Sequence, residues 1–466
     1  MDVLIAGGGL SGLTMAALLG RYGLTCLVVE SERDVPRAPR NHRLNPRTMA
    51  VLRGAGLERP VRAIELGHDS GGLIMADTLT GTAGTRLPSP WQPVPSQVSE
   101  VPVCVCNERD LETVMRAEVR ERGAEIRLGA TLTDFDVGTD RVTGVLRDGT
   151  TVEARYLIAA GGPPLRDAAG VSAHGPDRLG RQLTISFRAD LDLRDGYLIG
   201  SVNGLLLPEE PGVFGLTVPM TGLTPEQCVD LIRIAAGRPD LPVELVDLTP
   251  LEIAAQVADR FVRGRVLLAG KSAYSSPPTP GLMGNARIQD AHNLAWKLAL
   301  VLSGQAGPAL LDSYDTERRP LAELAVRDAL SRLPAHMAAP AEPLPVDRLT
   351  FELGFRYGDA ARFEDPRTPS LLPGGMIPHF DLSARSFVLL SGRDEQRWRA
   401  AAGPLGVDVR PGGPGPEALL VRPDGFVAWR SADPDHLAEA LDRLLHGERR
   451  RRASRPGTTC ARASGR

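Results

Sequence analysis

The sequence predicts an α/β fold, and three patterns along its 466 residues support that class. Short apolar runs such as Val3–Ala6 are followed by stretches of helical periodicity, which is the order of a parallel sheet covered by helices. A middle segment alternates apolar and polar residues, as in Gln182–Leu191, and this indicates half-buried strands. A strand-rich unit follows a proline-rich stretch near the C-terminal end. The length fits about three domains.

The first element is a strand, a glycine-rich turn and a helix. The predicted strand Val3–Ala6 leads into Gly7, Gly9 and Gly12, which form G-x-G-x-x-G at the start of a helix expected over residues 11–22. Gly7 permits the tight turn, Gly9 leaves room for a pyrophosphate, and Gly12 lets the helix lie close to the strand. The phosphates would meet the positive end of the helix dipole.

A second apolar strand, expected over residues 25–29, completes this unit and ends in Glu30. The Glu30 carboxylate is placed to accept hydrogen bonds from the ribose hydroxyls of an adenosine. Strand, turn, helix, second strand and terminal acid at this spacing predict a Rossmann-like site for an ADP moiety. A glycine-rich turn without a ligand would leave Gly9 unexplained.

The chain is expected to leave this nucleotide-binding domain and return to it twice. Helices are predicted over residues 48–55, 108–122, 286–303 and 308–333, and strands over 125–128, 141–146, 151–159 and 265–269. The domain is therefore discontinuous. Its expected segments are residues 1–70, 100–165 and 262–335.

The remaining segments predict two further units. Residues 71–99 and 166–261 form a second β-sheet layer suited to binding a substrate, with strands expected at 182–191, 197–200 and 213–218 and a helix at 224–236. Residues 336–369 are expected to be a linker, and 370–446 follow a β, α, β, β, α order that suggests a thioredoxin-like domain. That domain lacks C-x-x-C, which argues against redox work. The basic tail, 447–466, is expected to be disordered.

Composition excludes several classes of partner. A net charge of −3 argues against nucleic acid, and no apolar run approaches the roughly 20 residues that span a bilayer. We therefore expect a cytoplasmic protein that acts on a small molecule. Five irregularly spaced cysteines fit neither a disulfide framework nor a metal cluster, so buried inert thiols are expected. The oligomeric state cannot be read from the sequence.

Ten segments together resemble the class A FAD-dependent aromatic hydroxylases, the para-hydroxybenzoate hydroxylase superfamily, in its polyketide-tailoring branch. The segments are GGGLSG with Glu30, LNPRTM after Arg40, NERDLE, YLIAAGG, GRVLLAGKSAY, PPTPGLMGN, IQDAHNLAWKLA, YDTERRP, ELGFRY and LLVRPDGFVAWR. The resemblance covers the chain to about residue 446. It implies an FAD-binding domain, NAD(P)H as the reductant of a redox-active enzyme, and a polyketide-like substrate.

The resemblance also implies a set of cofactor-binding residues. Arg40 would approach the flavin pyrophosphate or ring, and Arg109, or Glu108 in a shifted alignment, would contact the ribityl chain. The remaining contacts would come from Gly162, Gly270, Lys271, Gly281 and Asn285. Tyr274 stands where the family usually has a histidine and is the candidate catalytic residue, as a hydroxyl that donates to a substrate carbonyl or as a packed loop tyrosine.

Four positions depart from the family pattern. Gly161 and Lys271 replace the acids of the family's Asp-Gly and Gly-Asp motifs, while Met283 and Arg287 bring side chains into a glycine-rich turn. In one interpretation Lys271 reaches the pyrophosphate, FAD stays bound and the enzyme hydroxylates. In another interpretation, FAD is weakly bound, only structural or absent, and the cavity serves a non-redox ring closure or [4+2] cycloaddition. A third interpretation, an interaction protein without activity, is less favoured because the substrate layer persists.

Three more polar residues near these motifs have predicted roles. We expect His292 to be structural, Asp290 to brace the helix that carries both residues, and His42 to lie at the surface or reach the flavin region. The aromatic side chains available to stack on a substrate are Trp91, Phe187, Tyr197 and Phe214.

Overall fold

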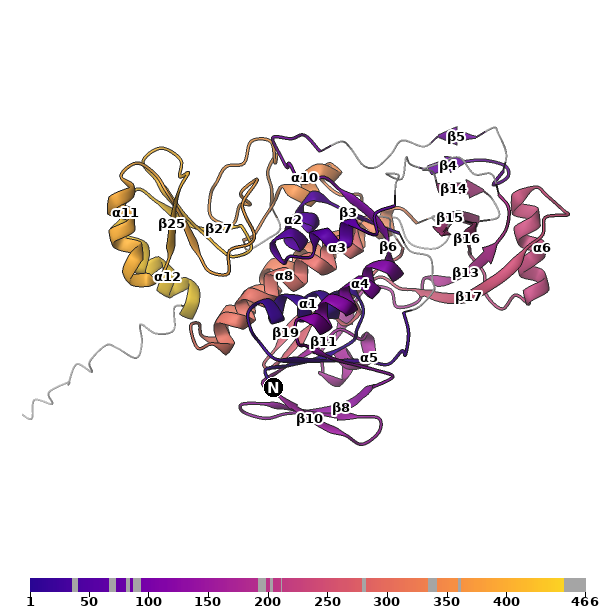
Figure 1. The fold of residues 1–466 in the computed structure, drawn as a ribbon, viewed down its shortest axis with the longest axis horizontal. Coiled ribbons are helices and arrows are strands. Elements are labelled where there is room, and N and C mark those ends of the chain that lie inside the picture. Colours follow the sequence, from indigo (N-terminus) through magenta and orange to yellow (C-terminus); the bar gives the residue numbers. More distant parts are fainter. Residues whose placement is uncertain are drawn as a thin grey trace, which may run out of the picture.

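The computed structural model describes residues 1–35, 41–66, 73–80, 84–86, 94–191, 198–201, 204–210, 212–278, 282–333, 342–358 and 362–447. Figure 1 shows three parts: a central domain, a second sheet with helix α6 on one side of it, and a C-terminal unit on the other. The α/β class and the Rossmann-like first domain are confirmed. The expected disordered tail, apart from Gly447, lies outside the described residues.

The central domain is built on a six-stranded sheet in the order β19-β20-β11-β1-β2-β7, parallel except at the edge strand β19. Val3 of β1 lies opposite Cys26 of β2 and Tyr156 of β11. Both faces of the sheet are covered, which explains why its inner strands are continuous apolar runs. The strands are β1 (Val3–Ala6), β2 (Cys26–Glu30), β7 (Glu125–Leu128), β11 (Tyr156–Ala159), β19 (Val262–Arg263) and β20 (Val266–Leu268).

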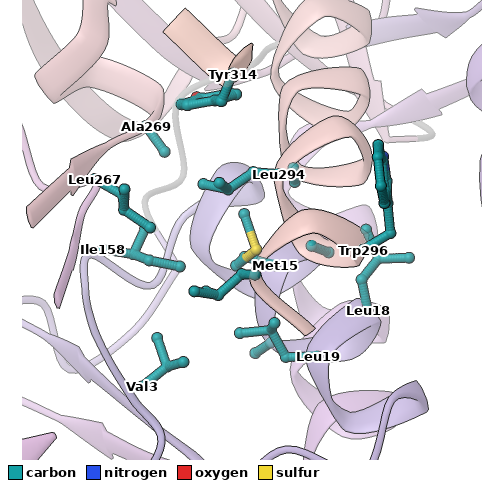
Figure 2. Close-up of a cluster of buried hydrophobic side chains, with 14 of the residues drawn as sticks. Val3, Met15, Leu18, Leu19, Ile158, Leu267, Ala269, Leu294, Trp296 and Tyr314 are labelled. Carbon is teal, nitrogen blue, oxygen red and sulfur yellow. The ribbon is translucent and has the colours of Figure 1, made fainter. Parts of the chain in front are cut away.

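Helix α1 (Leu10–Arg21) lies between helices α4 (Glu108–Glu121) and α8 (Met283–Leu302) on one face of this sheet. Figure 2 shows side chains of α1, among them Met15 and Leu19, packed with Leu294 of α8 and Ile158 of β11. Met15, Leu19, Leu294 and Ile158 are all fully buried. Each such burial contributes roughly 1.5–3 kcal/mol, so this packing fixes the direction of α1.

The other face is covered by an antiparallel three-stranded sheet in the order β10-β9-β8. Gly144 of β9 allows the close approach, because a Cβ there would lie 2.8 Å from the side chain of Leu4. The sequence prediction of one strand over 151–159 is wrong: the chain turns at Arg155, and its two halves join different sheets. The strands of the small sheet are β8 (Leu132–Val137), β9 (Val142–Leu146) and β10 (Thr151–Ala154).

The second layer is a seven-stranded sheet in the order β17-β13-β16-β15-β14-β4-β5. The strand predicted over 197–200 corresponds to β14 and the one over 182–191 to β13, and β15 and β16 lie between them. Helix α6 (Pro225–Ala236) begins with a capping box formed by Thr224 and Gln227. The strands are β4 (Leu73–Met75), β5 (Thr85–Arg86), β13 (Gly180–Arg188), β14 (Leu198–Ser201), β15 (Gly204–Glu210), β16 (Val213–Val218) and β17 (Glu244–Ile253).

The C-terminal unit contains a four-stranded sheet in the order β25-β24-β26-β27, with β24 and β25 parallel and the other pairs antiparallel. Its order is β, α, β, β, β, α, so the sequence prediction omitted β25, which is short and ends in a proline. The elements are β24 (Val388–Ser391), α11 (Glu395–Ala402), β25 (Asp408–Pro411), β26 (Ala418–Val421), β27 (Val427–Ser431) and α12 (Leu437–His446), with 3-10 turns at Gly403–Leu405 and Pro434–His436.

The segment expected to be a linker is partly structured. Helix α10 (Arg348–Leu353) is capped by the side chain of Asp347, and a two-stranded hairpin follows it. The expected helix over 308–333 begins as a 3-10 turn, η1 (Pro308–Leu311), before α9 (Asp312–Ser331). The other short elements are β3 (Asn41–Leu44), α2 (Pro46–Gly54), α3 (Glu58–Arg62), β6 (Cys104–Asn107), α5 (Pro163–Ala168), β12 (Ala173–His174), β18 (Gln256–Ala258), α7 (Gly270–Ala273), β21 (Tyr274–Ser275), β22 (Phe355–Arg356) and β23 (Arg362–Phe363).

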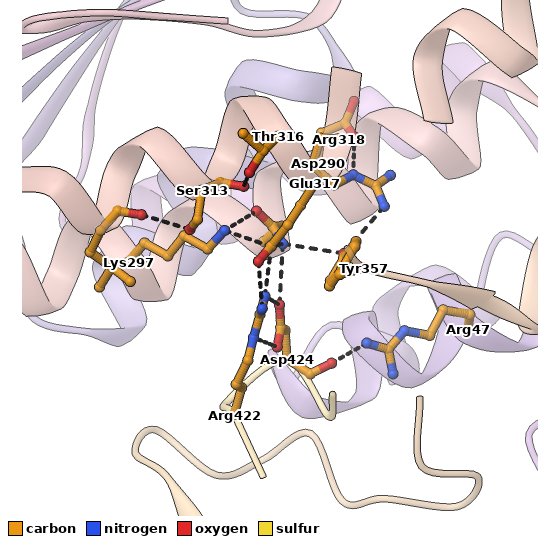
Figure 3. Close-up of polar contacts among 12 residues, drawn as sticks. Arg47, Asp290, Lys297, Ser313, Thr316, Glu317, Arg318, Tyr357, Arg422 and Asp424 are labelled. Carbon is orange, nitrogen blue, oxygen red and sulfur yellow. Dashed lines mark hydrogen bonds and ion pairs between the residues drawn. The ribbon is translucent and has the colours of Figure 1, made fainter. Parts of the chain in front are cut away.

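A buried group of charged residues joins the central domain to the C-terminal unit (Figure 3). Glu317 of α9 lies 2.7 Å from Lys297 of α8 and 2.6 Å from Arg422, which follows β26. Arg422 also pairs with Asp424 at 2.6 Å. Because these side chains are buried and mutually paired, the C-terminal unit is fixed against helices α8 and α9.

Two predictions from composition can be checked against the described residues. Cys26, Cys104, Cys106 and Cys228 are buried free thiols, as expected. Cys460 lies outside the part that the structure describes. No helix among the described residues is both long and apolar enough to cross a membrane.

Candidate functional site

A cavity of about 530 Å³ opens at the carboxyl edge of the central sheet. Its walls include residues within two positions of the ends of four strands: Gly7 after β1, Ser31 after β2, Gly161 after β11 and Gly270 after β20. Ligands of open parallel sheets bind at this edge. The cavity also touches Thr249–Leu251 of β17, so it connects the nucleotide domain with the second sheet.

The glycine turn has the geometry that its spacing predicts. Gly7 has φ of +119°, and a Cβ there would lie 2.7 Å from the backbone of Ala160 and Gly161. A Cβ on Gly12 would overlap the carbonyl oxygen of Gly7, so helix α1 can start this close to β1 only with glycine. Gly9 faces the cavity, and the nearest neighbour of a Cβ added there would be the Glu112 carboxylate, at 3.4 Å.

Glu30 lies at the end of β2 and lines the same cavity. One carboxylate oxygen accepts the backbone N–H of Gly8 at 2.6 Å, and the other accepts the backbone N–H of Glu32 at 2.9 Å. The side chain thus ties the glycine turn to the end of β2. Its position is the one expected of an acid that faces the adenosine ribose.

Helix α4 presents Glu108, Glu112 and Arg116 to the cavity. These residues are spaced by four and therefore lie on one helix face. Arg109 is not among the residues that line the cavity, so of the two ribityl candidates the structure places Glu108 toward the cleft. The sequence prediction missed Glu112 and Arg116, although their spacing from Glu108 was a signal for both.

Glu112 meets the start of helix α1 directly. Its carboxylate accepts the backbone N–H of Leu10 at 3.1 Å. Burial, together with the negative charge of Glu108, raises the pKa of the Glu112 carboxyl to about 7. Near neutral pH this side chain is therefore close to half protonated at the point where phosphates would approach.

The loops after β11 and β20 are held together by Ser272. Its hydroxyl donates to the carbonyl oxygen of Gly162 at 2.8 Å and lies 2.9 Å from the backbone nitrogen of Gly162. Gly162 has φ of +118°, and Gly270 has φ of +53° and lies against Ser11. Lys271 is exposed at the cavity wall. A serine missed in the sequence therefore links the two loops at which the family resemblance implies carboxylates.

The start of helix α8 lies directly against strand β3. The Asn285 side chain donates to the carbonyl oxygen of Arg43 and accepts from the backbone N–H of Asn45, both at 2.8 Å. A Cβ on Gly284 would lie 2.7 Å from the His42 ring, and His42 Nε2 lies 3.6 Å from the Glu108 carboxylate. His42 is thus partly buried between Gly284 and Glu108, and Glu108 lines the cavity.

Tyr274 is buried and stands apart from the 530 Å³ cavity. Its hydroxyl donates to Asp290 at 2.7 Å, and its ring stacks on Phe261. Burial and the Asp290 charge raise the pKa of Tyr274 well above its usual value. Of the two alternatives for Tyr274, a donor to a substrate carbonyl or a packed loop tyrosine, this geometry corresponds to the second, because its single O–H is already donated to Asp290.

Asp290 and His292 have structural surroundings. Asp290 pairs with Arg318 of α9 at 2.6 Å as well as accepting from Tyr274, so it braces α8 against its neighbours as expected. Burial, together with the Arg47 charge, lowers the pKa of His292 to about 3. His292 therefore stays neutral in the physiological range and packs as a structural residue.

Several predicted site residues lie outside the described part of the chain. Arg40 and Gly281 are two of them, and so are the aromatic candidates Trp91 and Tyr197. Phe187 and Phe214 are described, and their rings pack against each other with centroids 5.9 Å apart. Both rings belong to the core of the second sheet.

These residues fit the ADP half of FAD. The cavity holds the glycine turn, the start of α1 and Glu30, which are the groups that bind a diphosphate and a ribose. Lys271 and Arg287 bring cations to the wall of the same cavity, and the Asn285 amide is bonded to β3. The fit is thus strongest for the part of the cofactor that carries the phosphates.

Comparisons with known proteins agree with this geometry. Residues 1–329 match the family model described as FAD binding domain, and residues 370–447 match that described as aromatic-ring hydroxylase, C-terminal. A putative polyketide hydroxylase of Streptomyces halstedii is 36% identical, with 96% of each chain covered. Aklavinone 12-hydroxylase RdmE of Streptomyces purpurascens is 35% identical over 97% of this chain and 98% of its own.

Solved structures give the same picture. A ternary complex of aklavinone-11 hydroxylase with FAD and aklavinone has a TM-score of 0.84 and 34% identity, covering 95% of this chain and 98% of its own. The rebeccamycin biosynthetic enzyme RebC with reduced flavin has a TM-score of 0.77 and 26% identity, covering 95% and 98%. Both were solved with a flavin.

Proposed function

The chain belongs to the FAD-binding aromatic-ring hydroxylases, and from that membership we propose that it hydroxylates a polyketide-like aromatic compound with FAD and NAD(P)H. The observation that carries the proposal is the cavity, which reaches from the glycine turn and Glu30 to Thr249–Leu251 of the second sheet. A cofactor bound at the glycine turn would therefore meet a substrate bound against β17. Bound FAD supplies the redox chemistry in such enzymes.

The chain's own residues would bind and orient the two ligands. The start of α1 presents backbone N–H groups and a positive dipole end to the phosphates. Ser272 fixes the loops that flank them, and the Asn285 amide fixes the start of α8 against β3. The buried pairing of Tyr274, Asp290 and Arg318 anchors the end of the loop after β20 to helices α8 and α9.

The substrate class is proposed from the relatives. Aklavinone is a substrate or ligand in the names of the relatives reported above, and tetracenomycin B2 is the named substrate of a further relative, 32% identical, from Streptomyces olivaceus. Both names denote polyketide products. The second sheet, with β17 as its strand nearest the cleft, would form one wall of the pocket for such a molecule.

The direct test uses aklavinone as a probe substrate. The purified full chain is supplied with FAD and incubated with aklavinone, with and without NADPH and oxygen, and the products are weighed by mass spectrometry. A product that gains one oxygen atom only when both NADPH and oxygen are present supports hydroxylation. A panel of aromatic polyketides that all remain unchanged, despite bound FAD, would contradict it.

A second candidate is a non-redox ring closure in the same cavity. It is favoured by one observation: Gly161 and Lys271 stand at the loops where the family resemblance implies carboxylates, and Arg287 lies beside them. Misplacement by about 1 Å near reacting atoms can cost a hundredfold in rate, so these changes would harm redox catalysis more than folding. A ring closure would need the cavity mainly to hold reacting ends together and exclude water.

The two candidates give different products. Ring closure would convert a linear or partly cyclised polyketide into an isomer of unchanged mass, without NADPH or oxygen. It would also continue in protein from which flavin has been removed, unless FAD is structural. Slow or undetectable NADPH oxidation in the presence of such an isomer would favour this candidate.

A further inference from the structure

Two arginines face the cavity from helices on either side of α1. Arg116 lies on α4 and Arg287 on the first turns of α8, and α1 packs between these helices. The Nε atoms of both side chains are buried and have no hydrogen-bond partner among the described residues. Arg116 as a whole is only 7% exposed. Both arginines therefore border one cavity, and each has one buried N–H donor without a partner among those residues.

An unsatisfied buried guanidinium nitrogen is unfavourable. Burying a polar group without a hydrogen bond costs free energy, and nearly all such groups in folded proteins have a partner. Water could satisfy one of them. Two unbonded guanidinium nitrogens beside the same cavity, near the helix end that favours anions, point to an anionic ligand as the missing partner.

The charge around this end of the cavity favours the same ligand. Lys271 lines the cavity as a third cation, while the Glu30 carboxylate is occupied by two backbone N–H groups. The Glu112 carboxyl has a raised pKa and can become neutral when a phosphate approaches. A diphosphate carries two negative charges and offers oxygens that match the planar, forked donors of arginine.

We propose that Arg116 and Arg287 clamp the diphosphate of the bound dinucleotide from opposite sides of α1, and that the cleft recognises its cofactor mainly through the ADP half. This inference rests on the proposed function in one respect, that the ligand is an adenine dinucleotide.

The proposal predicts which ligands bind. ADP carries the clamped group without the flavin ring and should compete with FAD, whereas riboflavin lacks the diphosphate and should bind poorly or not at all. Binding of FAD and ADP should weaken together as salt is added, because both depend on the same charges.

The test is calorimetric titration of flavin-free full-length protein with FAD, ADP and riboflavin. Arg116→Gln and Arg287→Gln should each lower the affinity for FAD and for ADP by the same factor. The expected factor is about tenfold to a hundredfold, which is the range for one charge-assisted hydrogen bond. Arg116→Lys should recover part of the loss. Arg120→Ala is the matched control, since Arg120 is exposed on the same helix and does not line the cavity.

Thermal unfolding of each variant shows whether it is folded before its affinity is interpreted. Folded Gln variants that bind FAD and ADP like the Arg120→Ala control would overturn the clamp. So would a loss that affects FAD alone, because the diphosphate is common to both ligands.

The clamp and the proposed function can fail separately. Arginine-dependent ADP binding without FAD binding would support the clamp and contradict the FAD-dependent function. FAD binding and oxygen transfer that are indifferent to both arginines would support the function and overturn the clamp. A folded protein that binds neither nucleotide would overturn both.

Discussion

The carboxylate of Glu112 accepts the backbone N–H of Leu10 at 3.1 Å, across the mouth of the glycine turn. This N–H is one of the donors that the first turn of α1 would offer to a phosphate. A bound diphosphate and an ionised Glu112 would therefore compete for the same positive region. Because burial already raises the pKa of Glu112 to about 7, protonation can relieve that competition near neutral pH.

Glu112 should make stability depend on pH. A carboxyl whose pKa is raised in the folded state favours folding while it is protonated. The free energy of unfolding therefore falls as the pH rises from about 4.5 to 7. The loss is roughly 3 kcal/mol for a shift of this size. The glutamine of Glu112→Gln cannot ionise, so the free energy of unfolding of this variant should rise relative to that of the parent protein as the pH rises. Urea unfolding at pH 5 and pH 8 measures this, and an equal difference at both pH values would contradict it.

Gly9→Val should abolish binding of FAD and ADP without unfolding the protein. Gly9 has ordinary extended backbone angles and faces the cavity, so a valine there is tolerated by the backbone but fills the path of the diphosphate. Fluorescence quenching of added FAD reports the binding. Gly403→Ala, at a position with φ of −54° and no neighbour within 4 Å of an added Cβ, is a control for glycine replacement as such. Retained FAD affinity in Gly9→Val would remove the basis for placing the cofactor here.

Lys271 distinguishes two accounts of the loop after β20. If its ammonium neutralises phosphate, Lys271→Ala should weaken FAD by about tenfold. Lys271→Asp should instead create an acid at the position where the family resemblance implies a ribityl contact, and should tighten FAD relative to Lys271→Ala. Tighter binding in both variants would show that the lysine merely crowds the flavin.

Glu317 should hold the C-terminal unit in place. Although burial opposes ionisation, the charges of Arg422 and Lys297 lower the pKa of Glu317 well below its usual value. Glu317→Gln would leave two buried cations partly unpaired and should cost roughly 3–5 kcal/mol in unfolding free energy. Glu323→Gln on the same helix is the control, because its partner Arg319 lies at the surface and the pair contributes less than about 1 kcal/mol. Equal losses in both variants would contradict this role.

Local sequence patterns predicted the elements of the central domain well. The glycine spacing and Glu30 located the first β-α-β unit, since each of those residues has one backbone or ligand reason to be there. Strand β17 was missed because it is an edge strand that contains Pro250 and exposes much of its length, which removes both the apolar run and the clean alternation.

The site was predicted only where its residues belong to one motif. Glu112 bonds the start of α1 from 102 residues away, and Ser272 bonds Gly162 from 110 residues away. Spacing within the sequence does not encode such contacts, nor the place of Arg116 in the wall of the same cavity. Helical spacing relates Glu108, Glu112 and Arg116 to one another but does not show which face meets the cleft. That choice is made by the packing of α4 against α1.

Whether the cleft at the glycine turn holds FAD is measured by the flavin content of the full-length protein. The chain is incubated with FAD, freed of unbound cofactor, and its flavin absorbance is compared with its protein concentration. We expect a yellow protein with close to one FAD per chain, which excess ADP displaces. A colourless, folded protein after the same treatment would contradict it.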